Sequence, residues 1–139
     1  MSIDLTIVTP QGVAYQGPVE SVVLPGSEGE FGVLENHERF LSPLQTGEVE
    51  IKTREGSIFA AIAQGFADVV GGEVTVLVVS CEVGGEIDVA RAELARERAS
   101  QDLAQLDRDE DGGRFEEFEA ALQRAENRLA VSSHAKGGS

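Results

Sequence analysis

Several residue types that carry common protein chemistry are rare or absent in this sequence. It has one cysteine, Cys81, together with two histidines and no tryptophan. A single cysteine can form neither an internal disulfide nor a metal site built from several cysteines. Cys81 closes a predicted strand, where we expect its short side chain to pack against its neighbours. Disulfide-stapled folds and cysteine-rich zinc folds are therefore excluded, and the core must rest on Val, Leu, Ile and Ala.

Positive charge and long apolar runs are also scarce. The chain has 11 basic and 25 acidic residues, and its net charge is −14. DNA, RNA and anionic lipid surfaces are negatively charged, so general electrostatics disfavour all three as partners. No apolar run approaches the roughly 18 residues of a membrane span, and the amino-terminal residues lack the basic start of a signal peptide. We therefore expect a cytosolic protein with no nucleic-acid partner and no direct membrane insertion.

Residues 1–84 have the pattern of short strands. Apolar and polar side chains alternate over residues 2–8 and 47–52, which is the period of a strand with one buried face. Glycine and proline punctuate the rest at short intervals, for example at Gly65 and at Gly71-Gly72. Short strands with frequent turns predict a β-sandwich or a barrel.

Residues 85–139 change to a helical pattern. Asp88 is placed to cap a first helix, because its carboxylate can accept hydrogen bonds from the free amides of the first turn. A second helix is predicted over residues 114–131, after an acidic, glycine-containing break at residues 107–113. Two amphipathic helices joined by a short loop form an antiparallel hairpin. The apolar stripe of the first helix consists of Ala92, Ala95, Ala99, Leu103 and Leu106.

The sequence thus predicts two domains. A β-sandwich domain occupies residues 1–84, and residues 85–139 form the helical hairpin with a flexible C-terminal tail from residue 132. Because alanine buries little apolar area, the seam of the hairpin would barely offset the cost of ordering its backbone. We expect the hairpin to dock on another surface or to move.

A glycine-rich, acidic stretch at residues 24–41 has three possible interpretations. As a phosphate loop it lacks the GxxxxGK[ST] pattern and any lysine, and its four glutamates would repel phosphate. As a metal site it offers His37 beside Glu35 and Glu38, but neighbours on an irregular segment rarely converge on one ion. The remaining interpretation is a shaped surface for another protein, with Phe31 and Val33 holding the loop on the sandwich.

The arginines of the hairpin form a second candidate site. Each of Arg91, Arg98, Arg124 and Arg128 stands one position before a seam residue. In an antiparallel pair, positions with the same offset lie on the same side, so the folded hairpin would gather four guanidinium groups on one edge. Guanidinium groups suit bidentate contact with phosphate. A solvated helix face and a contact with an acidic protein remain as alternatives.

The first half contains LPGSEGEFGVLENHERFLSPLQTGEVEIK and GFADVVGGEVTVLV, and the hairpin begins with IDVARA. Together these segments resemble one family, the epsilon subunit of bacterial F-type ATP synthase (delta in mitochondria). It implies a ten-stranded β-sandwich followed by a helical hairpin. It also implies a non-catalytic subunit of the central stalk, which couples proton-driven c-ring rotation through gamma to ATP synthesis. Such a subunit is peripheral, on the cytoplasmic face of the bacterial inner membrane.

The resemblance also assigns residues. The surface that faces the c-ring loops would carry Glu30, Phe31 and His37. No cofactor is required, but ATP is implied as a regulatory ligand of the hairpin. By match to the family motifs, its ligands would be Glu82, Ile87, Asp88, Arg91, Ala92, Arg98, Arg124 and Arg128.

Contacts of the hairpin with the alpha or beta subunits, which inhibit ATP hydrolysis, are implied as well. This sequence departs from a strongly basic pattern there, because DRDEDGG separates the helices and Lys136 is the only lysine of the hairpin. Two alternatives to the stalk subunit stay open. One is an ATP-binding regulator with little mechanical role, and the other is an unrelated β-sandwich adaptor protein with a helical docking arm.

Overall fold

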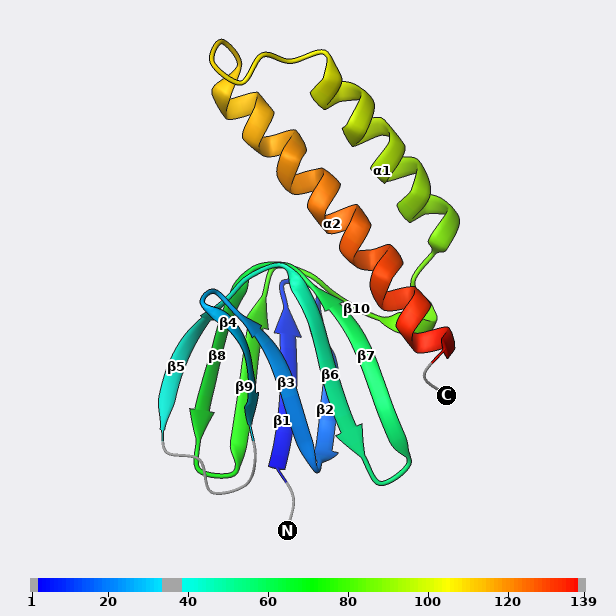
Figure 1. The fold of residues 1–139 in the computed structure, drawn as a ribbon. Helices are drawn as coiled ribbons and strands as arrows, with labels where there is room; N and C mark the ends of the chain where they lie inside the picture. Colours follow the sequence, from blue (N-terminus) through cyan, green and yellow to red (C-terminus); the bar gives the residue numbers. More distant parts are fainter. Residues whose placement is uncertain (1–2, 34–38, 138–139) are drawn as a thin grey trace.

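The computed structural model describes residues 3–33 and 39–137 and shows a β-sandwich joined to a helical hairpin (Figure 1). Within these residues there is one 10-stranded sheet, so the predicted fold class is confirmed. The strands are β1 (Ile3–Thr9), β2 (Gly12–Val19), β3 (Ser21–Gly26), β4 (Gly29–Val33), β5 (Phe40–Leu44), β6 (Gly47–Thr53), β7 (Gly56–Ile62), β8 (Gly65–Val70), β9 (Glu73–Val78) and β10 (Cys81–Val83). A short 3-10 helix, η1 (Gly84–Glu86), leads into α1 (Val89–Ala104) and α2 (Gly112–Gly137).

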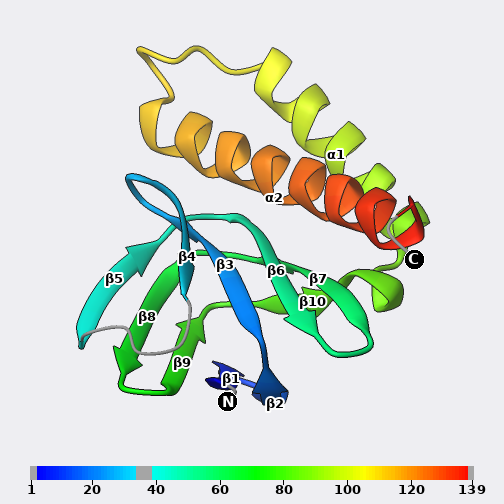
Figure 2. The same ribbon diagram turned by 60° about the horizontal axis from the view of Figure 1, so that its bottom comes forward.

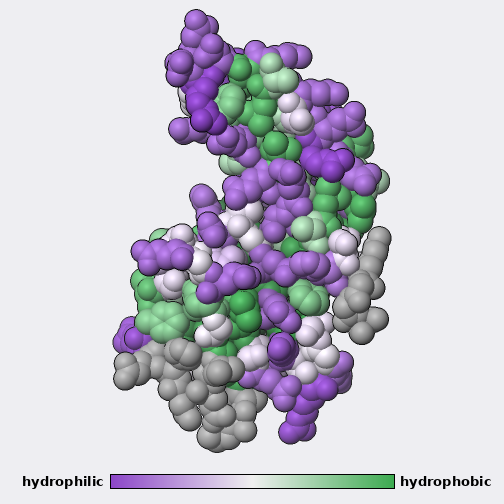
Figure 3. Space-filling model, viewed as in Figure 1, coloured by the Kyte–Doolittle hydropathy of each residue, from purple (hydrophilic) through white to green (hydrophobic). Residues whose placement is uncertain are grey.

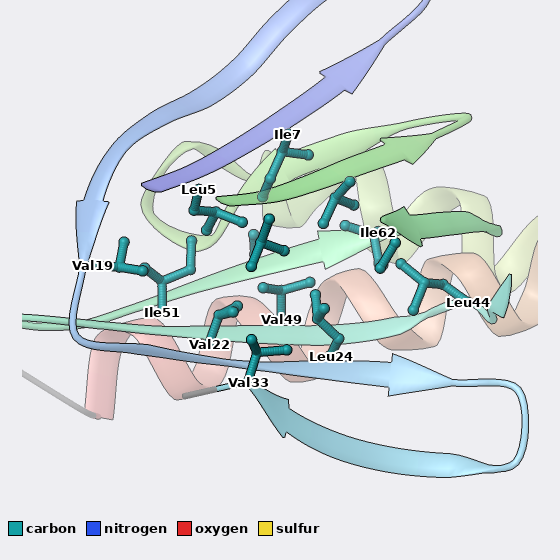
Figure 4. Packing of buried hydrophobic residues seen from close by; sticks show 14 of the residues in the cluster. Leu5, Ile7, Val19, Val22, Leu24, Val33, Leu44, Val49, Ile51 and Ile62 are labelled. Carbon is teal, nitrogen blue, oxygen red and sulfur yellow. The ribbon is translucent and has the colours of Figure 1, made fainter. Parts of the chain in front are cut away.

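The strands follow one another across the sheet in the order β10-β7-β6-β3-β5-β8-β9-β1-β2, with β4 paired to β3. All pairs are antiparallel except β1 with β9. The sheet folds over on itself, and aliphatic side chains from its inner faces meet in one cluster, as Figure 4 shows. In β1, Ile3, Leu5 and Ile7 are buried as the alternation predicts.

The hairpin begins as the sequence predicts. The Asp88 side chain accepts a hydrogen bond from the backbone N–H of Arg91 at 3.1 Å, which caps the N-terminus of α1. The helices run antiparallel, and Ala92, Ala99 and Ala125 are buried in the seam between them. Ala95 was also predicted as a seam residue, but it is exposed on α1.

The second helix is longer than predicted. It continues to Gly137, through residues that the sequence predicts as a frayed tail. Val131 and Ser132 are buried, and the His134 ring lies 5.7 Å from the ring of Phe59. This end of the helix is thus held by tertiary contacts that no local pattern reveals.

The hairpin docks on the sandwich through α2. Figures 1 and 2 show α2 lying between α1 and the sheet, and its contacts fall on β6, β7 and η1. Gly84 allows this close approach, because a Cβ there would lie 2.6 Å from the Cβ of Ala135. No helix in the described ranges is both long and apolar enough to cross a membrane. The exposed surface of the hairpin is largely hydrophilic in Figure 3, whereas hydrophobic side chains gather around β5.

Candidate functional site

A cavity of about 270 Å³ lies where the hairpin meets the sandwich. Small residues leave this space open: Ala61 and Ala63 on the β7 side, Ala95 on α1 and Ala121 on α2 all line it. The polar groups around it come from different parts of the chain. They are Thr46, Ser80, Glu82, Arg124, Asn127 and Arg128.

An ion pair between α2 and β10 forms part of the wall of the cavity. Nε of Arg128 lies 2.6 Å from Oε1 of Glu82, and Nη2 donates a hydrogen bond to Oε2 at 3.0 Å. Two guanidinium nitrogens thus face the two oxygens of one carboxylate, and the ion pair is bidentate.

A second polar contact fixes α2 beside the same cavity. Nδ2 of Asn127 donates a hydrogen bond to the carbonyl oxygen of Gly47 at 2.9 Å, at the start of β6. Sequence reasoning did not single out Asn127, because its partner lies 80 residues away in the chain. The one feature of the sequence that could have indicated this contact is the position of Asn127 next to Arg128.

The structure separates the eight predicted nucleotide ligands into groups. Those that line the cavity are Glu82, Arg124 and Arg128. Ile87 and Ala92 are buried, and Ile87 packs with Val131 and Ala61 beneath the hairpin. Asp88 serves as the helix cap. Arg91 and Arg98 are exposed on α1 and do not line the cavity. Among the described residues, the one that α1 contributes to the lining is Ala95.

The single cysteine, which lies next to the cavity, has low reactivity. Burial raises the pKa of the Cys81 thiol to about 11, with a smaller contribution from the neighbouring Glu82 carboxylate. The thiol therefore stays protonated near neutral pH and is a poor nucleophile. Within residues 3–33 and 39–137, no group of three or more His, Cys, Asp or Glu side chains is arranged to hold a metal ion.

The predicted ring-facing residues lie around the turn between β3 and β4. Glu30 is exposed on β4, one residue after the turn, where it pairs with Pro25. Phe31 is half-buried and meets the ring of Phe40 edge-on at 5.7 Å, while Val33 is buried in the core. Glu30 thus stands on a strand that Phe31 and Val33 anchor to the sandwich. His37 lies outside the described residues.

A surface that the sequence did not reveal lies on the outer face of β5, β8 and β9. We call it the apolar strip, and it consists of Leu41, Pro43, Phe66 and Leu77. In the register of the sheet, Phe66 pairs with Pro43 on one side and with Leu77 on the other. Leu41, Phe66 and Leu77 are 66%, 53% and 52% exposed. Contiguous exposed apolar side chains mark interaction surfaces.

One signal in the sequence could have indicated the strip. In β9 the inward side chains are Val74, Val76 and Val78, so the outward position of Leu77 should be polar in a solvent-facing strand. The apolar residue at this outward position is the signal that the sequence offers for the strip.

Comparison with known proteins gives a consistent result over both domains. Residues 2–84 match the family model described as ATP synthase, Delta/Epsilon chain, beta-sandwich domain. Residues 86–133 match the model for the long alpha-helix domain of the same chain.

Curated relatives extend the likeness over nearly the full length. The chain is 45% identical to the ATP synthase epsilon chain of Syntrophobacter fumaroxidans, covering 94% of this chain and 95% of the relative. It is 39% identical to the ATP synthase epsilon chain of Staphylococcus haemolyticus, covering 94% and 96%.

Solved structures share the fold. A chain in the OSCP/F1/c-ring structure of Euglena gracilis mitochondrial ATP synthase matches with a TM-score of 0.78 and 28% identity, over 93% of this chain and 80% of that one. A chain in the central stalk/c-ring structure of Tetrahymena thermophila mitochondrial ATP synthase matches at 0.51 and 13% identity, over 66% and 70%, which shows the fold alone.

Proposed function

The chain belongs to the ATP synthase delta/epsilon family, and we propose that it is a non-catalytic subunit of the central stalk. In this role it clamps the gamma subunit to the c-ring, so that ring rotation driven by protons reaches the catalytic head. The apolar strip is the observation that carries the proposal, because it offers a rigid surface that needs a partner. The likeness to a chain of an assembly that contains F1 and the c-ring supports it.

We assign the apolar strip to the gamma subunit. The hairpin contacts β6, β7 and η1, so it leaves the outer face of β5, β8 and β9 open to a second protein. A face built on three hydrogen-bonded strands is rigid, which suits a part that must transmit torque. The c-ring loops would be met by Glu30, beside the β3–β4 turn, and the complex would sit at the cytoplasmic face of the bacterial inner membrane.

Binding to the gamma subunit tests this assignment directly. The chain mixed with purified gamma subunit is expected to elute with it as one complex in size-exclusion chromatography. Separate elution at micromolar concentrations of both proteins would contradict the assignment of the apolar strip to the gamma subunit.

A second proposal concerns regulation, and the cavity beside Arg128 favours it. Arg124 and Arg128 place two guanidinium groups at an opening between hairpin and sandwich. Phosphate oxygens would supply acceptors for both. Since such a ligand would contact α2 and the sandwich together, ATP would stabilise the docked hairpin by mass action.

Calorimetric titration of the full chain with ATP tests the regulatory proposal. Binding is expected, and Arg124→Ala should weaken it about tenfold or more, because a charged hydrogen bond is lost. Arg114→Ala is the matched control, since Arg114 is exposed in the first turn of α2 and does not line the cavity. Absence of binding at millimolar ATP, or equal weakening by both variants, would contradict a nucleotide site here.

A further inference from the structure

The apolar strip is part of a longer row of outward-facing side chains. In the register of the sheet, Leu77 on β9 pairs with Val8 on β1, and Val8 pairs with Val13 on β2. Val13 is 59% exposed, and Val8 is half-buried. Together with the pairs inside the strip, these pairs join one apolar residue from each of five neighbouring strands. We call this set the apolar row, and it consists of Pro43, Phe66, Leu77, Val8 and Val13.

A β-bulge in β2 brings Val13 into the row. Ile7 of β1 pairs with Tyr15, whereas Val8, the next residue of β1, pairs with Val13. The residue that the register skips is Ala14, and it packs against the core together with Tyr15. Strict alternation from Tyr15 would turn Ala14 outward and Val13 inward. The bulge reverses this order and directs an apolar side chain toward solvent.

One flank of the apolar row is polar and acidic. Next to the row runs a second one, in which Leu41 is followed by the polar residues Asp68, Thr75, Thr6 and Gln16. Beyond the second row, Glu73 on β9 pairs with Asp4 on β1. Over the outer face of β8, β9 and β1, the charged residues are therefore Asp68, Glu73 and Asp4. A partner that covers the row and carries basic residues on this side would complement their charge.

The width and length of the row limit what can cover it. In the described sheet β8, β9 and β1 have neighbouring strands on both sides, so this face offers no free backbone edge for an added strand. A second sheet packed face to face would also cover the polar row and bury Asp68. A helix presents one apolar stripe and satisfies its own backbone hydrogen bonds. The row spans four strand spacings, or about 19 Å, which is the length of about 13 helical residues.

We propose that an amphipathic helix of the gamma subunit lies across the five strands on the apolar row. This inference rests on the proposed assignment of the apolar strip to the gamma subunit, and it adds the kind of element that the surface binds. The apolar stripe of the helix packs along the row from Pro43 to Val13. Lysine or arginine side chains on one flank of the helix face Asp68 and the acidic pair beyond it.

Dissociation constants with purified gamma subunit test how far the surface extends. Val13→Asp is expected to weaken binding about tenfold, because the new carboxylate would be covered by the apolar stripe of the helix. Val70→Asp is the matched control. Val70 is 42% exposed on the outer face of β8, but it lies outside the row and pairs with Glu73. This variant should bind as tightly as the wild type.

Photo-crosslinking tests whether the bound element is a helix. A photo-reactive benzoylphenylalanine would replace Pro43 in one sample of the full chain and Val13 in another. The two probes stand at opposite ends of the row, so they are expected to label one segment of the gamma subunit at positions about 13 residues apart. Labels about six residues apart would indicate an extended strand, and labels in separate segments would indicate several short contacts. Either result would overturn the helix.

The binding data separate this inference from the assignment on which it rests. If Phe66→Asp weakens binding and Val13→Asp does not, the row is not one surface and the inference fails, while the strip remains the gamma contact. If the wild-type chain does not bind the gamma subunit, the assignment and the inference both fail. Equal weakening by Val13→Asp and Val70→Asp would also overturn the inference, because the effect would not follow the row.

Discussion

Replacing Gly65 by valine is expected to lower the free energy of unfolding by about 3 kcal/mol. A Cβ at Gly65 would lie 2.0 Å from the carbonyl oxygen of Leu77 and 2.8 Å from the Cα of Val78. Both atoms belong to the backbone of β9, which is hydrogen-bonded between β8 and β1 and cannot give way without breaking the ladder. Overpacking against fixed atoms is among the most damaging changes that a core can suffer. Urea unfolding of the full chain measures the effect.

Gly32→Val is the matched control for this prediction. Gly32 lies on β4, where a Cβ would meet nothing within 4 Å, and its backbone does not have a positive φ. The free energy of unfolding should change by no more than about 0.5 kcal/mol. If the two variants unfolded at the same urea concentration, the close approach of β8 and β9 would not be a requirement of the fold.

Phe66→Asp is expected to weaken binding to the gamma subunit about a hundredfold or more. Phe66 stands at the centre of the apolar strip, between Pro43 and Leu77. Its side chain is 53% exposed in the free chain, so an aspartate there stays solvated and the fold persists. In the complex the carboxylate would be buried against apolar surface without a partner, which costs several kcal/mol. The dissociation constant with purified gamma subunit measures the loss.

Leu94→Asp makes the same change in charge at another exposed leucine. Leu94 is 66% exposed on α1, away from the strip. Binding of this variant should equal that of the wild type. Loss of binding in both variants would indicate a general effect of charge or folding, and tight binding by Phe66→Asp would place the gamma contact elsewhere.

Strand prediction succeeded where one face of a strand is buried and the other is exposed. β1 and β6 alternate cleanly, and the breaks at Gly65 and Gly71 separate β7, β8 and β9 as the glycines indicate. No strand was predicted over β2, β4, β5 or β10. β2 and β10 lie at the two ends of the strand order, and β4 and the start of β5 fall in the glycine-rich, acidic stretch that was interpreted as a loop. That the sandwich has ten strands came from the family resemblance rather than from periodicity.

The sequence predicted several residues of the site but not the residues that they contact. Local spacing predicted Asp88 as a helix cap and singled out Arg124 and Arg128 on α2. It could not predict that Arg128 meets Glu82 or that His134 meets Glu48, because these pairs are 46 and 86 residues apart in the chain. The frayed tail was predicted for the same reason, since its helical order depends on docking.

Proton-driven ATP synthesis in membrane vesicles measures the proposed coupling role. Vesicles would carry an ATP synthase complex that lacks its own epsilon chain, and the full chain would be added back with or without Glu30→Lys. The wild-type chain is expected to restore synthesis, and Glu30→Lys is expected to restore less of it. Glu55→Lys should act as the wild type, because Glu55 lies at the opposite end of the sandwich, in the turn between β6 and β7. Vesicles that bind the chain yet gain no proton-driven synthesis would contradict a coupling role.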